Sequence, residues 1–230
     1  MQENAHIKLQ QLKRTAKPLR ILSLIGAIAV AVILVAFLLM PAANLQMDIG
    51  KYADGYNYYG WQLTFLGCGY IPVKIFALFE PGQLSGDYVP GSYDFGFNIW
   101  TTLAVILPIV AIIVCGIVKT RMKNRGKAVC DFIMAAFFLF GGVMLLNVVP
   151  LSTLVASDLG AGTGFRMQIL EPALEAGTYK TLAYPIVTFV VCLVFALVKI
   201  GNGAFLLYQR SYARKNRPTS NEKEVNPVNE

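Results

Sequence analysis

The chain has very few of the side chains that metal and redox sites use. His6 is the only histidine, and the four cysteines contain no C-x-x-C pair. Zinc sites and dithiol redox centres usually place two such ligands a few residues apart. The sequence therefore predicts no metal site, no dithiol centre and no histidine-dependent catalysis.

Charged residues are also scarce. They make up 14% of the chain, against about a quarter in a soluble domain, whereas hydrophobic residues make up 56%. Crossing a bilayer takes roughly 20 mainly apolar residues. Four stretches are long enough: Ile21–Met40, Asn98–Val118, Ala128–Val149 and Leu182–Leu207. We therefore expect an all-α membrane protein, a four-transmembrane-helix bundle forming one domain over residues 21–207.

The net charge of +7 is unevenly distributed. Lys119–Lys127 carries five bases and no acid, residues 1–20 carry five bases and one acid, and residues 208–230 carry five bases and three acids. Acids outnumber bases in the connections 41–97 and 150–181. Cytoplasmic segments are the ones enriched in Lys and Arg, so we predict a plasma-membrane protein with both termini cytoplasmic and 41–97 and 150–181 as outer loops. The basic segments then face anionic lipids of the cytoplasmic leaflet, and no nucleic-acid partner is needed.

The outer loop 41–97 is rich in aromatic residues and is expected to form a structured cap. Its segment Gln62–Phe79 is apolar enough to raise the question of a fifth span, but a fifth crossing would invert the charge rule. Trp61, Leu63 and Phe65 alternate with polar residues, the pattern of a half-buried strand. Residues 74–79 either pair with that strand as a short β-hairpin or form a short helix.

Two roles remain open for the aromatic rings of this loop. The favoured one is an interfacial belt, where amphipathic rings lie at the level of the lipid head groups. The other is a dedicated interaction surface. Its candidate residues are Tyr58, Tyr59, Trp61 and Phe65.

Lys199 is the clearest charge inside a predicted span, and an ionisable residue inside a membrane is by default a candidate functional site. Counting from an interface at Tyr208, it lies roughly 13 Å deep at 1.5 Å per residue. Asp131 on the third span is close enough in depth to pair with it. Structural pairing or anchoring is the favoured role, and an ion or proton pathway is the alternative. Pro108 predicts a kink or an opened backbone hydrogen bond in the second span.

The glycine-rich segment at 158–164, DLGAGTG, looks like the loop by which Rossmann-type methyltransferases hold S-adenosylmethionine. That loop works between a buried strand and a helix of a βαβ sheet. Here it falls in a connection of about 30 residues that has no room for such a sheet. We therefore expect a flexible turn leading into an interfacial helix at 166–176, and no cofactor.

In this chain the longer first outer loop contains Gly60-Trp61 followed by Cys68. This layout is similar to that of claudin-like tetraspan proteins. The loop has no second cysteine for that family's disulfide, so we do not expect the family's paracellular-barrier function in this chain. The chain also resembles uncharacterised four-span proteins of Gram-positive bacteria in three short patches: 60–67 (GWQLTFLG), 97–100 (FNIW) and 159–162 (LGAG). This resemblance implies a four-span fold and no known activity.

The predicted function is that of a non-enzymatic interaction, scaffold or accessory component of the plasma membrane. Its partners are the lipid bilayer and a further copy of itself or a larger membrane complex. The alternative is a small transporter or permease subunit that uses Lys199 and Asp131. No set of catalytic groups is evident in the spans or at their ends. Residues 208–230 are too polar to fold and are expected to form a disordered tail.

Overall fold

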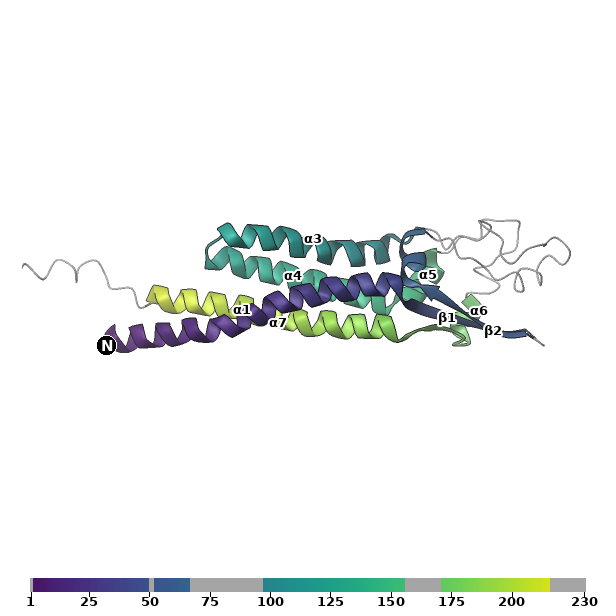
Figure 1. Ribbon diagram of the computed structural model, residues 1–230, viewed down its shortest axis with the longest axis horizontal. Coiled ribbons are helices and arrows are strands. Elements are labelled where there is room, and N and C mark those ends of the chain that lie inside the picture. The colour runs from purple at the N-terminus through teal and green to yellow at the C-terminus, as the bar shows by residue number, and fades with distance from the viewer. Residues whose placement is uncertain (1, 50–51, 67–96, 156–170, 216–230) are drawn as a thin grey trace, which may run out of the picture.

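The computed structural model describes residues 2–49, 52–66, 97–155 and 171–215. Four long helices run side by side in it: α1 (Gln2–Leu39), α3 (Ile99–Arg121), α4 (Asn124–Leu146) and α7 (Ala183–Lys215) (Figure 1). All four are long and apolar enough to cross a membrane. The predicted bundle of four apolar helices is confirmed.

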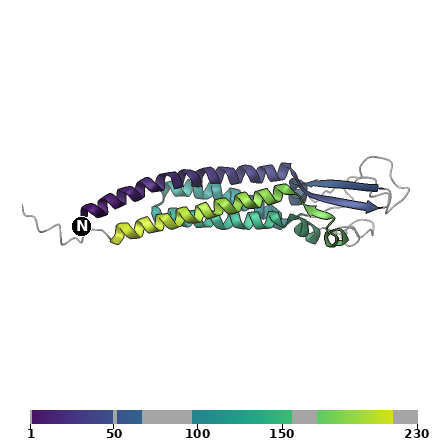
Figure 2. The ribbon, with the colours of Figure 1, turned by 90° about the horizontal axis from the view of Figure 1, so that it is seen from below.

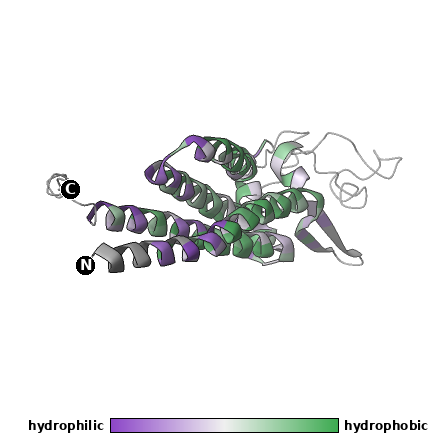
Figure 3. Ribbon diagram, turned by 60° about the vertical axis from the view of Figure 1, so that its left-hand side comes forward, coloured by the Kyte–Doolittle hydropathy of each residue, from purple (hydrophilic) through white to green (hydrophobic). Residues whose placement is uncertain are grey.

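The three basic segments lie at one end of this bundle. The N-terminal part of α1, the connection between α3 and α4, and the C-terminal part of α7 all point away from the strands (Figures 1 and 2). Figure 3 shows hydrophilic residues gathered there, with apolar residues along the helices. We call this region, made of residues 10–20, 119–127 and 208–215, the basic end, and the opposite region with the strands the sheet end.

Two helices are longer than the sequence predicted. α1 begins before Ile21, and α7 continues to Lys215, so residues 208–215 of the expected disordered tail are helical. The two helices support each other there, since the side-chain amide of Gln209 donates to the carbonyl of Leu12 at 2.8 Å. Mutual contact therefore extends the helices beyond the apolar stretches that defined the predicted spans.

The strands form a small antiparallel sheet at the sheet end. β1 (Pro41–Ile49) follows α1 directly and pairs with β2 (Tyr52–Tyr59) on one side and β3 (Tyr179–Thr181) on the other. Leu45 lies opposite Tyr56 of β2 and Tyr179 of β3. A hairpin therefore exists, but it lies before the predicted position. The residues expected to form its strand are instead helical, with the π-helical turn η1 at Gln62–Leu66.

Polar side chains explain why this segment is not a strand. The Gln62 side chain accepts a hydrogen bond from the backbone N–H of Tyr59 at 2.8 Å, and the Thr64 hydroxyl donates to the carbonyl of Gly60 at 2.7 Å. The hydroxyl of Thr102 on α3 donates to the carbonyl of Thr64 at 2.9 Å. These bonds stabilise a turn, because local side-chain to backbone bonds compete with strand pairing. Gln62, Leu63 and Thr64 are all buried and Trp61 and Phe65 are half-buried, so the predicted alternation is not observed.

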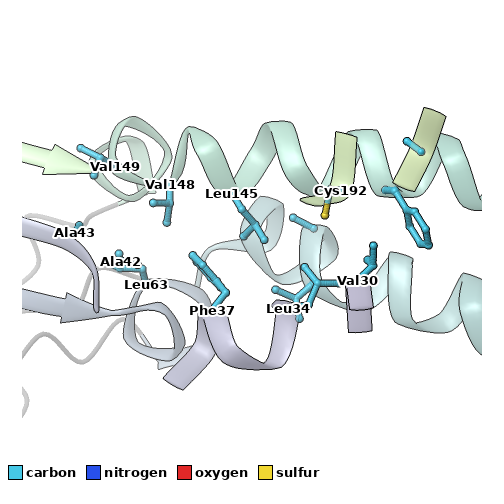
Figure 4. Close-up of a cluster of buried hydrophobic side chains, with 14 of the residues drawn as sticks. Val30, Leu34, Phe37, Ala42, Ala43, Leu63, Leu145, Val148, Val149 and Cys192 are labelled. Atoms are coloured by element: carbon cyan, nitrogen blue, oxygen red, sulfur yellow. The ribbon is translucent and has the colours of Figure 1, made fainter. Parts of the chain in front are cut away.

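The hydrophobic core is continuous from the helices into the sheet (Figure 4). Phe37 near the end of α1, Leu63 of η1 and Leu145 near the end of α4 are all almost fully buried. Two short helices, α5 (Val148–Val155) and α6 (Glu171–Glu175), cover the same end, and Val148 joins the core. The sheet is therefore packed onto the bundle and is part of one folded unit.

Glycines on α4 bring the helices close together. At Gly142 a Cβ atom would lie 2.9 Å from the Cβ of Cys192 on α7, and at Gly141 it would lie 2.6 Å from the carbonyl oxygen of Ala104 on α3. Pro108 has no N–H to donate to the carbonyl of Ala104, four residues earlier, so one backbone hydrogen bond of α3 is open, as the sequence predicted. Because Gly141 has no side chain, α4 can approach this carbonyl closely. This is the small-residue packing expected between membrane helices.

Candidate functional site

A buried carboxylate links three helices at the basic end. Asp131, in the second turn of α4, is 0% exposed. Its Oδ1 accepts from the Nζ of Lys119 on α3 and lies 3.7 Å from the Nζ of Lys199 on α7. Its Oδ2 accepts from the side-chain amide of Asn202 on α7 at 2.7 Å. The structure therefore brings the predicted residues Asp131 and Lys199 together and adds two partners.

Burial makes this arrangement energetically demanding. Lys199 is 3% exposed and Asn202 is 2% exposed, whereas the side chain of Lys119 keeps 22% of its exposure. A buried charge is tolerated only when paired and hydrogen-bonded. Here two ammonium groups share one carboxylate, so the cluster carries an excess positive charge. The free oxygen of Asn202 accepts no hydrogen bond within the described residues.

The cluster lies near the basic end of the bundle. Lys119 is in the last turn of α3, and α7 runs 16 residues beyond Lys199 to Lys215. The predicted depth of Lys199 assumed that its span ended near residue 207. Measured from the end of α3 instead, the cluster lies within about a turn or two of the α3–α4 connection.

A cavity of about 320 Å³ adjoins the cluster. Its buried lining residues come from α1, α4 and α7, among them Ala27, Met134 and Lys199. Its exposed lining residues lie on α1 and α3, among them Leu24 and Gly116. Its full lining is Arg20, Ser23, Leu24, Ala27, Ile112, Gly116, Lys119, Thr120, Lys127, Met134, Lys199, Asn202 and Leu206. All four long helices therefore contribute to one hollow that is apolar on some walls and cationic on others.

The predicted aromatic surface is divided by the structure. Tyr58 is 1% exposed and packs edge-on against Tyr179, with ring centroids 6.1 Å apart, so it belongs to the core. Trp61, directly before η1, and Phe65, within η1, are half-buried. Tyr59 is 41% exposed. Of the four candidates, Tyr59 is the one that presents most of its ring to the surroundings.

Tyr179 links the sheet to α5 through a buried hydroxyl. The hydroxyl oxygens of Tyr179 and Ser152 are 2.8 Å apart. Burial raises the pKa of Tyr179 well above its usual value, and the hydrogen bond with Ser152 opposes that shift. The phenol therefore stays neutral at physiological pH and acts as a structural hydrogen-bonding group.

Within the part of the chain that the structure describes, no three His, Cys, Asp or Glu side chains come together as a metal site. The DLGAGTG segment at 158–164, residues 74–79 and Cys68 lie outside the described residues. Of the helix expected over 166–176, Glu171–Glu175 is observed as α6.

Two residues of the charge cluster were missed from the sequence. Lys119 was counted as part of the basic connection, yet α3 continues to Arg121 and turns Lys119 toward α4. Asn202 lies three residues after Lys199, which puts both on one helix face. A polar residue at that spacing from a lysine inside an apolar run was the available signal.

Comparison with protein-family models, with curated proteins and with solved structures gave no match. The resemblance to four-span proteins of Gram-positive bacteria stays a prediction.

Proposed function

We propose that this protein is a non-enzymatic interaction, scaffold or accessory component of the plasma membrane. One observation carries the proposal: the two buried charged residues of the described helices, Asp131 and Lys199, are bound to each other. Asp131 is held by Lys119, Lys199 and Asn202, and the cluster thereby joins α3, α4 and α7. Charged groups that are paired across helices hold those helices together.

The proposed orientation has both termini in the cytoplasm. Its support is the charge distribution, because Lys and Arg are enriched on the cytoplasmic side and three basic segments lie at one end of the bundle. The sheet end then faces outward, where its partner is another membrane or surface protein.

The proposed contact surface includes Tyr59. This residue ends β2, and its ring is 41% exposed beside a core that holds the strand in place. Exposed tyrosines on a rigid support are favoured at protein interfaces because they bury a large area at little entropic cost.

Site-specific photo-crosslinking tests this proposal. A photoreactive phenylalanine analogue replaces Tyr59 in the intact chain, and a second variant carries it at Tyr208 as the matched control. Tyr208 is also an exposed tyrosine, at 53%, but it lies toward the basic end on α7. We expect a discrete protein adduct from position 59 that position 208 does not give.

Adducts with lipid alone at position 59, or the same protein adduct from both positions, contradict a contact surface at the sheet end. Labelling of tags at the two termini from the outside of intact cells contradicts the orientation. The two parts of the proposal therefore fail separately.

A second candidate is a small transporter or permease subunit, and the cavity favours it. Lys119 and Lys199 line this hollow, and ionisable residues facing a cavity inside a bundle mark substrate or ion pathways in transporters. Solute or proton flux in liposomes containing the purified protein, abolished by Asp131→Asn in a folded variant, would establish it. Liposomes without flux count against it.

A further inference from the structure

We infer that the cavity at the basic end binds an anionic phospholipid, with the phosphate held by cations and an acyl chain lying along α1 and α3. The inference rests on the proposed membrane location. It assigns a ligand to a hollow that the proposed function leaves without a role.

The charge around the cavity is the first argument. Each long helix contributes one cation to the lining: Arg20 from α1, Lys119 from α3, Lys127 from α4 and Lys199 from α7. Asp131 is the carboxylate that this cluster contains. Four cations against one carboxylate leave a large excess of positive charge, which a phosphate group neutralises.

The availability of two of these cations is the second argument. Lys119 and Lys199 are bound to Asp131, but Arg20 and Lys127 have no ion-pair partner among the described residues. They come from different helices and line the same hollow. A ligand phosphate in this hollow would supply the anion that both cations lack.

The apolar walls distinguish a lipid from a free phosphate compound. Leu24 and Ala27 on α1 and Ile112 on α3 line the cavity beside the cations. A hollow of about 320 Å³ is at the lower end of the range of about 300–1,000 Å³ for small-molecule sites. The exposed residues of its lining lie on α1 and α3, two helices that are long and apolar enough to cross a membrane. A lipid can therefore enter sideways from the bilayer.

Gly116 is a position at which a larger side chain can be introduced to test the site. It lines the cavity, and a Cβ atom built there would have no other atom within 4 Å. Gly116→Leu therefore adds a large side chain at the cavity lining, with no clash at its Cβ atom. Gly201 on α7 also has open space around its Cβ position and is not part of the lining. Gly201→Leu is the matched control for placing leucine at an open helical glycine.

The experiment is native mass spectrometry of the purified full-length protein in neutral detergent. It is titrated with dioleoylphosphatidylglycerol and separately with dioleoylphosphatidylcholine, which has the same acyl chains and no net charge. We expect about 25-fold tighter binding of the anionic lipid, since Arg20 and Lys127 should each contribute about fivefold, or about 1 kcal/mol, near an anionic head group. Arg20→Gln and Lys127→Gln should each weaken that binding about fivefold and leave phosphatidylcholine unaffected.

Gly116→Leu should abolish the preference for the anionic lipid, and Gly201→Leu should keep it, with thermal unfolding temperatures recorded for both. If Gly116→Leu fails to fold, the two charge variants decide. Equal binding of both lipids overturns the inference, and so does a folded Gly116→Leu variant that binds like the wild type. Displacement of lipid by soluble glycerol phosphate at equal concentration points to a free phosphate ligand and overturns it too. A dimer that Gly116→Leu dissociates, without bound lipid, identifies a second copy as the occupant.

Binding in detergent does not depend on orientation or on a partner at the sheet end. The lipid inference and the proposed function therefore fail independently.

Discussion

Ion pairs join the helices at the basic end, whereas uncharged groups and direct backbone contact join the helices to the sheet at the other end. At the basic end, Asp131 holds Lys119 and Lys199. At the sheet end, Gly60 lies against the backbone of Phe37, and Tyr179 meets Ser152. The first kind of contact depends on charge balance, and the second depends on shape. The two ends should therefore respond to different substitutions.

The largest effect is expected at the basic end. Asp131→Asn removes the carboxylate and leaves the buried ammonium group of Lys199 without its counter-charge, a change that costs about 3–5 kcal/mol when one partner of a buried pair is lost. Thermal unfolding of the detergent-purified protein and its monodisperse yield measure the loss. Lys199→Met alone should also lower the yield, and the double variant should recover part of it. Additive losses would show that the two residues do not interact.

A smaller effect is expected at the sheet end from Gly60→Ala. The added Cβ would lie 2.1 Å from the carbonyl oxygen of Phe37, so the chain must shift where α1 meets the turn after β2. Overpacking of this kind costs about 1–3 kcal/mol. Amide hydrogen exchange in β1 should rise while exchange in the middle of α4 stays unchanged. The control is Gly201→Ala, which has open space and should be neutral or slightly stabilising. Equal destabilisation by both variants would show that the close contact between Gly60 and the backbone of Phe37 is not the cause.

Removal of one hydroxyl at the sheet end should cost less. Tyr179→Phe keeps the ring against Tyr58 but takes away the hydrogen bond with Ser152, for a loss of about 1 kcal/mol. Ser152→Ala should cost a similar amount, and the two changes together should cost less than their sum. Unfolding temperatures of the three variants provide this double-mutant cycle. Full additivity would mean that the two hydroxyls act separately.

The smallest expected effect is a loss of stability of the sheet end at high pH. Burial raises the pKa of Tyr179 in the folded protein above the value of about 10 in the unfolded chain. The unfolded state therefore loses its proton first, so the stabilising contribution is complete below pH 10 and decreases as the pH rises further. In the first half pH unit above 10 the loss should stay below about 1 kcal/mol. Hydrogen exchange of β1, corrected for intrinsic rates, should show this loss in the wild type and not in Tyr179→Phe.

The sequence predicted the helices well because one strong physical signal defines them. Long apolar runs and the basic segment Lys119–Lys127 identified four helices and put three basic segments at one end, as Figures 1 and 3 show. Asp131 and Lys199 could be paired because charged residues inside such runs are rare and need partners. The ends of α1 and α7 were missed, since their exposed polar turns carry no hydrophobic signal.

The sheet was only half predicted because its signal is weak and its partners are distant. Residues 41–49 contain small and polar residues, with Ala42, Ala43 and Leu45 buried, and do not show a regular alternation. The clearer alternation at 61–65 belongs to a helical turn whose polar side chains bond to nearby backbone. β3 comes from a connection more than 100 residues later, so no local pattern could reveal the pairing.

The direct passage of α1 into β1 and of β3 into α7 gives the molecule a continuous mechanical path. The N-terminal end of α1 and the C-terminal end of α7 lie at the same end of the bundle, and the two helices are joined at the other end by the pairing of β1 with β3. A force that pulls the termini apart therefore peels α1 from α7 turn by turn, starting at the contact between Gln209 and Leu12. The load reaches the strands last. The hairpin of α3 and α4 lies outside this path along the chain and is tied to α7 through the Asp131 cluster.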